Sequence, residues 1–151
     1  MLRRTGAALN LAMTPEAKPL PNRITIKSDM DAAREVQEDI LAKASKRGFD
    51  DKCLFALRIG MEEAMINAHK HGNRFDQHKN ITIEYDIRPD RVVIRIRDEG
   101  EGFDPAKIPD PTEAQRLSLP CGRGVLLMRS FMDDVSYGPR GNEVQLVKEN
   151  A

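Results

Sequence analysis

The chain has 151 residues, 40% of them hydrophobic and 32% charged, which is the balance of a folded domain rather than of a disordered segment. Lys plus Arg and Asp plus Glu both number 24, and this zero net charge argues against direct nucleic-acid binding. The two cysteines make neither a disulfide framework nor a metal-ligand pattern, and no apolar run reaches the roughly 18 residues of a membrane span, so we expect a cytoplasmic protein without membrane contact.

The N-terminal stretch MLRRTGAALNLAM resembles a signal peptide only in part, because no clear small-residue cleavage site follows it. We expect a flexible tail over residues 1–22 and one domain over residues 23–151. In that domain, RITIKS (23–28) alternates apolar and polar residues and is predicted to be a strand. A helix is expected next, capped by Asp29 or Asp31 and ended by Gly48.

A second helix is predicted from Asp50 or Asp51 to about His71. At about 100° per residue, its apolar residues share one face, which we assign to the core. These residues are Leu54, Leu57, Met61, Ala64, Met65 and Ala68. Glu63, Asn67 and His71 fall along a separate line, so the helix is expected to carry a polar stripe beside its buried face.

The rest of the chain alternates strands with turn-forming segments. Strands are predicted at 80–87 and 91–98, followed by a Gly- and Pro-rich loop at about 99–124. A short helix over 125–132 and a closing hairpin complete the order, with strands at 134–138 and 143–148. This order predicts an α+β fold, a two-layer sandwich of a mixed, mainly antiparallel sheet with its helices on one face.

Three segments carry residues suited to a ligand with phosphate groups. Asn67 has an amide oxygen of the kind that Mg²⁺ accepts, and Glu63 lies one helical turn away, where a carboxylate could take a proton. DEGEGFD (98–104) follows a strand, so Asp98 can accept a hydrogen bond from an amine while the glycines allow a tight turn. GRG (122–124) precedes a helix, where free backbone N–H groups favour anions.

The ordered combination resembles the GHKL ATPase superfamily, which has the Bergerat nucleotide-binding fold. EEAMINAHKHGN (62–73) resembles its N box, DEGEGFD its first glycine box, and GRGVLLMRSFMDDVSY (122–137) its second. Within the superfamily, the similarity is to the anti-sigma factor serine/threonine kinases, which are single-domain switch kinases. It extends over most of residues 23–149.

The resemblance implies a function for each of these segments. Glu63 would be the general base for a Ser or Thr hydroxyl, Asn67 would coordinate Mg²⁺, and Asp98 would bind the adenine amino group of ATP. The residues expected to contact the nucleotide are Asn67, Lys70, His71, Asp98, Gly100, Gly102, Phe103, Arg116, Gly122, Arg123, Gly124 and Val125. The loop at 99–124 would be a lid, with either Arg116 or Arg123 at the γ-phosphate.

The implied partners are a sigma factor and an anti-anti-sigma protein of the STAS type, and the chain would form a homodimer. Two other functions fit the same residues. One is a nucleotide-gated protein-binding module without kinase activity. The other is a detached histidine-kinase catalytic domain, against which the tract LLMRSFMDDVSY (126–137) argues.

Overall fold

The computed structural model describes residues 18–101 and 127–150. Its elements in chain order are β1 (Asn22–Lys27), α2 (Met30–Lys46), α3 (Asp51–Ile66), the π-helical turn η2 (Asn67–Gly72), β2 (Asn80–Ile87), β3 (Arg91–Arg97), β4 (Asp134–Tyr137) and β5 (Glu143–Glu149). Residues 127–131 are also helical. Every predicted strand is therefore present, with ends that differ by at most one residue from the predicted ones.

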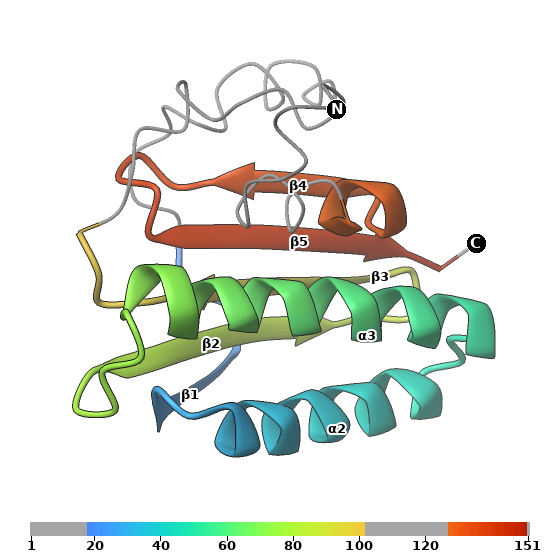
Figure 1. Ribbon diagram of the computed structural model, residues 1–151. Coiled ribbons are helices and arrows are strands. Elements are labelled where there is room, and N and C mark those ends of the chain that lie inside the picture. Colours follow the sequence, from blue (N-terminus) through green and yellow to red (C-terminus); the bar gives the residue numbers. More distant parts are fainter. Residues whose placement is uncertain (1–17, 102–126, 151) are drawn as a thin grey trace.

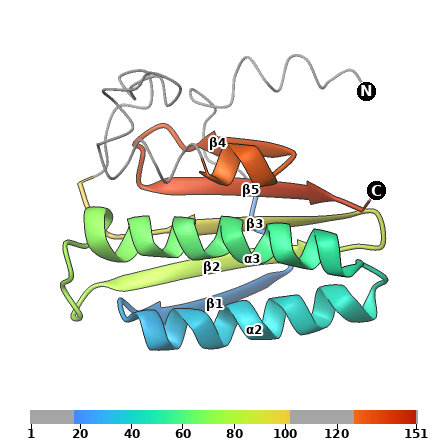
Figure 2. The ribbon, with the colours of Figure 1, turned by 45° about the vertical axis from the view of Figure 1, so that its right-hand side comes forward.

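The strands form one sheet in the order β1-β2-β3-β5-β4, and all four neighbouring pairs are antiparallel. Among the described strands the sheet is thus not mixed. Helices α2 and α3 and the helical residues 127–131 cover the same face of the sheet (Figures 1 and 2). The predicted α+β sandwich is confirmed, and it places the end of α3 and the end of β3 at the same edge of the molecule (Figure 1).

Aspartate side chains begin both long helices. Asp29 Oδ2 accepts from the Ala32 N–H at 3.3 Å at the start of α2. Asp50 Oδ1 accepts from the Cys53 N–H at 2.9 Å at the start of α3. Each side chain satisfies one backbone donor that the first helical turn leaves free, so the first aspartate of each predicted pair is the cap.

The predicted helix to His71 changes its hydrogen-bond pattern at Asn67. The α-helix ends at Ile66, and η2 continues to Gly72 with wider, i→i−5 turns. The Asn73 N–H, for example, donates to the Ala68 carbonyl at 2.8 Å. A wheel drawn at 100° per residue is therefore wrong beyond Asn67, and His71 does not continue the line of Glu63 and Asn67.

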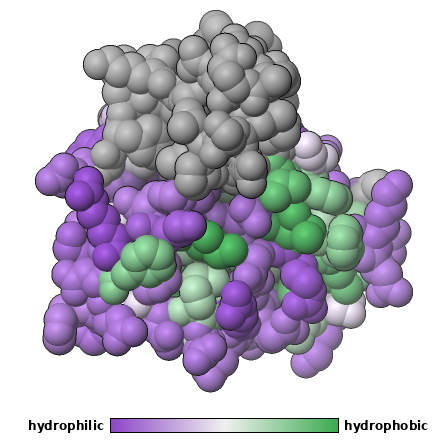
Figure 3. Space-filling view, in the orientation of Figure 1, coloured by the Kyte–Doolittle hydropathy of each residue, from purple (hydrophilic) through white to green (hydrophobic). Residues whose placement is uncertain are grey.

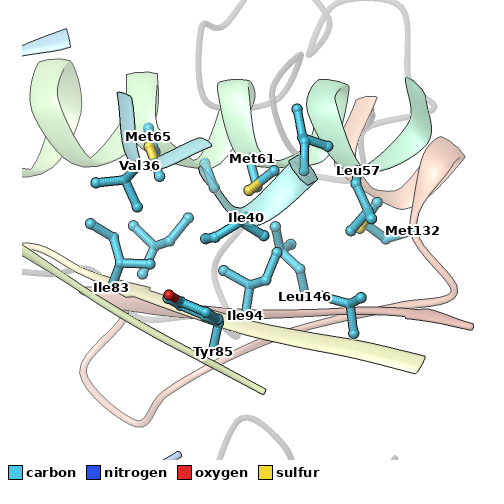
Figure 4. Packing of buried hydrophobic residues seen from close by; sticks show 14 of the residues in the cluster. Val36, Ile40, Leu57, Met61, Met65, Ile83, Tyr85, Ile94, Met132 and Leu146 are labelled. Atoms are coloured by element: carbon cyan, nitrogen blue, oxygen red, sulfur yellow. The ribbon is translucent and has the colours of Figure 1, made fainter. Parts of the chain in front are cut away.

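The core lies between the sheet and the helices, as Figure 4 shows for Ile40 and Met61 above Ile83, Ile94 and Leu146. The predicted core residues of α3 are buried except Leu54, which packs against the cluster from its edge. Gly60 allows close packing: a Cβ there would lie 2.9 Å from Met132 Cε. The close approach at this glycine is made by a core methionine.

The described surface is mainly hydrophilic on the face seen in Figure 3, with hydrophobic residues gathered beside the helical residues 127–131. Phe55 and Leu127 are exposed there, and the ring of Phe55 meets that of Phe131 edge-on at 5.8 Å. No helix among the described residues is long and apolar enough to span a membrane.

Candidate functional site

Glu63 and Asn67 lie one turn apart at the junction of α3 and η2, and both are partly exposed. Partial burial of the Glu63 carboxyl raises its pKa above the ordinary value, and the negative charge of the neighbouring Glu62 raises it further. A carboxylate that binds a proton more tightly is a better base. π-Helical turns are rare in proteins, and those that occur are often found at functional sites. The backbone conformation of η2 therefore agrees with a functional site at this junction.

Glu62 is fixed by two residues of α2. Its Oε2 accepts from Arg34 and its Oε1 from Gln37, both at 2.8 Å. The bond from Arg34 is the main reason why the pKa of Glu62 is lowered, so Glu62 stays negatively charged beside Glu63. The exposed pair adds little to stability, but it determines the charge next to the candidate base.

Asp98 begins the tight turn after β3. Its Oδ1 accepts from the Gly100 N–H at 2.8 Å, and no other donor to this carboxyl is found within residues 18–101 and 127–150. Burial raises the pKa of Asp98, against the lowering effects of the Gly100 N–H and of Lys79. The backbone of Asp98 is tied to Asn142, with N···O distances of 2.9 and 3.3 Å. Among the described residues, the second oxygen of this carboxylate, Oδ2, therefore accepts no hydrogen bond.

Gly72 at the end of η2 packs directly on this turn. A Cβ on Gly72 would lie 2.2 Å from both Cγ and Oδ2 of Asp98, and a Cβ on Gly100 would lie 2.1 Å from the Gly72 carbonyl oxygen. Gly72 does not have the positive φ of a helix-ending glycine, unlike Gly48 at 98°. Gly72 and Gly100 are therefore small because the two predicted boxes touch here.

Asn73, which sequence reasoning did not assign, connects the same segments. It is completely buried, and its Oδ1 accepts from the Glu99 N–H at 2.8 Å. Its Nδ2 donates to the Asn80 carbonyl at 3.1 Å. The available signal was a polar residue directly after the glycine at the end of η2, but a partner 26 residues away cannot be identified from one sequence.

A second residue without a predicted role, Ser28, binds η2 through a hydrogen bond to His69. Ser28 is fully buried, its Oγ lies 2.8 Å from His69 Nδ1, and its N–H donates to the Lys79 carbonyl at 3.0 Å. His69 in turn meets the ring of Phe75 edge-on at 5.2 Å. Lys70 is exposed, whereas His71 is partly buried, and that burial lowers the pKa of His71.

The other predicted nucleotide contacts lie outside the described residues. They are Gly102, Phe103, Arg116, Gly122, Arg123, Gly124 and Val125. The same holds for all of the expected lid beyond residue 101, so the choice between Arg116 and Arg123 stays open.

The described side chains fit a nucleotide that carries an amino group and a metal-bound phosphate chain. The Asp98 carboxyl has one protein donor within the described part of the chain, and it lies over a glycine whose missing side chain leaves it room. Within that part, no group of three or more His, Cys, Asp or Glu residues could hold a metal ion. Mg²⁺ usually keeps several waters and takes only one or two protein oxygens besides substrate phosphates, and the Asn67 amide oxygen is such a ligand.

The chain matches the family described as Histidine kinase-like ATPase domain over residues 26–148. It is 31% identical over 115 residues to a protein of Listeria innocua named serine-protein kinase RsbW, covering 70% of this chain and 71% of that protein. It is 31% identical over 102 residues to an anti-sigma F factor of Oceanobacillus iheyensis, covering 64% of this chain and 69% of that protein. The serine-protein kinase RsbW of Bacillus subtilis is 30% identical over 98 residues, which are 61% of each chain.

Proposed function

The chain belongs to the histidine kinase-like ATPase family, and we propose that it is an ATP- and Mg²⁺-dependent protein serine/threonine kinase of the anti-sigma factor type. The family confirms the resemblance to the GHKL superfamily, and relatives named serine-protein kinases and anti-sigma F factor support the kinase activity. The single observation that carries the proposal is the packing of Gly72 against the Asp98 carboxyl, which joins the segment bearing Glu63 and Asn67 to the segment bearing Asp98.

In the proposed mechanism, Glu63 accepts the proton of a Ser or Thr hydroxyl on a protein substrate. The oxygen of that hydroxyl forms a bond to the γ-phosphorus while the bond to the β-phosphate oxygen breaks and ADP leaves. The raised pKa of Glu63 favours the proton transfer. Mg²⁺, with Asn67 among its ligands, would neutralise charge on the phosphates.

Asp98 is proposed to select the nucleoside. Its carboxylate accepts a hydrogen bond from the adenine amino group, while the Gly100 N–H holds the other carboxylate oxygen. A hydrogen bond to a charged group contributes about 1.5–3 kcal/mol, which is enough to discriminate against a base that has a carbonyl in place of the amine. Lys70 and His71 at the end of η2, and the glycine-rich segment 122–124, are the proposed phosphate side of the site.

The proposed partners are a sigma factor, which the chain would bind and keep inactive, and a STAS-type anti-anti-sigma protein, which it would phosphorylate. We place the reaction in the cytoplasm, with the chain as a homodimer. The relatives' names support the anti-sigma role, since one relative is itself named an anti-sigma F factor.

The test is phosphate transfer from γ-labelled ATP to a STAS-type protein of the same organism, measured for the wild type and for Glu63→Gln. We expect the wild type to form an acid-stable phosphoserine or phosphothreonine. Glu63→Gln should form it at least about 100-fold more slowly, because a general base accelerates a reaction by about 10²–10⁴-fold. Stoichiometric binding without transfer would instead identify a nucleotide-gated binding module. An acid-labile phosphohistidine would identify a histidine kinase.

A further inference from the structure

We propose that Asn73 is a positioning residue for nucleobase selection, because its side chain fixes the turn that carries Asp98. The inference rests on the proposed function, since it assigns a role in ATP binding. Asn73 lies between the two predicted nucleotide segments and is completely buried.

All four polar groups of Asn73 have partners, and these partners come from different segments. Its N–H donates to Ala68 in η2 at 2.8 Å, and its carbonyl accepts from the Asp76 N–H at 3.0 Å. Its side-chain amide donates to the Asn80 carbonyl at 3.1 Å and accepts from the Glu99 N–H at 2.8 Å. Asn73 therefore joins the end of η2, the start of β2 and the turn after β3.

The two side-chain bonds require a primary amide at this position. The Glu99 N–H needs an acceptor, and the Asn80 carbonyl needs a donor. Serine is too short to reach both, and a buried backbone group without a partner is costly. An aspartate would keep the acceptor but place a second negative charge near the Asp98 carboxyl, with an oxygen facing the Asn80 carbonyl.

Asn73 acts on Asp98 through two neighbouring residues, Glu99 and Gly72. Glu99, whose N–H is bound by Asn73, is the residue between Asp98 and Gly100 in the turn. Gly72, which precedes Asn73, forms the surface on which the Asp98 carboxyl rests. The hydrogen bond from the Glu99 N–H to Asn73 Oδ1 thus holds the Asp98 carboxylate against Gly72, and with it the direction in which the carboxylate accepts.

The experiment measures the affinity for ATP and for inosine triphosphate, which has a carbonyl in place of the adenine amine. The variants are Asn73→Ser, Asp98→Asn and the double variant. We expect Asn73→Ser to weaken ATP binding by about tenfold or more and to change inosine triphosphate binding far less, because the lost interaction is a hydrogen bond to a charged group. In the Asp98→Asn background, Asn73→Ser should cost less than about twofold, since coupled residues are not additive.

Equal losses for both nucleotides, or fully additive losses in the double variant, would show a structural role only and overturn the inference. Asn22→Ser is the matched control, because it removes a side-chain bond to the Tyr85 carbonyl at the edge of the sheet. It should leave both affinities unchanged.

Amide hydrogen exchange of the wild type without nucleotide keeps the inference testable if Asn73→Ser does not fold. The Glu99 N–H should exchange at least about tenfold more slowly than it would in an unstructured chain, because it is bound within the native structure; exchange at the unprotected rate would refute the contact. If the wild type binds neither nucleotide, the proposed function itself fails. If Asp98→Asn loses discrimination and Asn73→Ser keeps it, only the present inference fails.

Discussion

Replacing Gly72 by alanine tests the contact between the two halves of the site. The added Cβ would lie 2.2 Å from Cγ and Oδ2 of Asp98. To reach van der Waals separation, the carboxyl must retreat by about 1 Å or more. It cannot do so freely, because Oδ1 is bonded to the Gly100 N–H and the Asp98 backbone is bonded to Asn142.

The expected cost has two parts. Overpacking of this kind destabilises a protein by about 1–3 kcal/mol, which lowers the melting temperature of a domain of this size by several degrees. Displacing the carboxylate also removes its hydrogen bond to the base, which weakens ATP binding by about 10- to 100-fold. Thermal unfolding and titration calorimetry with ATP measure the two effects separately.

Gly138→Ala is the matched control, since its Cβ would lie 3.4 Å from the nearest atom, Glu143 Cβ. This separation is an ordinary van der Waals contact, so the variant should match the wild type in ATP affinity. If Gly72→Ala also bound ATP within twofold of the wild type and melted at the same temperature, the argument from close packing would be wrong.

The remaining predictions concern three charged groups. Asp98→Asn should weaken ATP binding by about tenfold or more without lowering stability, because it removes a carboxylate whose burial is unfavourable; calorimetry and thermal melts check both. Because the pKa of Asp98 is raised in the folded chain, the folded protein binds this proton more tightly than the unfolded protein does. The free energy of unfolding should therefore fall as the pH rises from the ordinary pKa of an aspartate through the raised one. This pH-dependent fall in stability should be absent in Asp98→Asn. The rate of phosphate transfer should rise with pH as Glu63 loses its proton, with an apparent pKa above that of an ordinary glutamate. Glu62→Gln should move this limb of the pH–rate profile to lower pH, since it removes the neighbouring negative charge, while costing at most about 1 kcal/mol of stability; an unmoved limb would show that the charge of Glu62 does not act on Glu63.

The regular elements were predictable because their signals are local. Alternation in RITIKS and NITIEYDI indicated β1 and β2, and aspartates marked the starts of α2 and α3. The widening at η2 was not predictable. It depends on bonds such as that from the Asn73 N–H to Ala68, and on contact between Gly72 and a turn that lies far along the chain.

The residues of the candidate site also divide into those that local sequence predicts and those that depend on distant partners. Glu63, Asn67 and Asp98 could be named from residue type and spacing, because each lies beside a recognisable helix, strand or turn. The residues that fix them could not. Gln37 donates to Glu62, the neighbour of Glu63, over 25 residues, and Asn73 accepts from the Glu99 N–H, next to Asp98, over 26 residues. At Gly60, the sequence alone indicates only a residue that weakens a helix, and the structure identifies Met132 as the side chain that packs against it.

The most direct test of the account is titration calorimetry with ATP, with and without Mg²⁺, on the wild type beside Asn67→Ala. We predict that the wild type binds ATP more tightly with Mg²⁺ and that Asn67→Ala loses most of this metal-dependent gain while keeping its metal-free affinity. Absence of ATP binding by the wild type, or a gain from Mg²⁺ that is equal in both proteins, would contradict the assignment of this site.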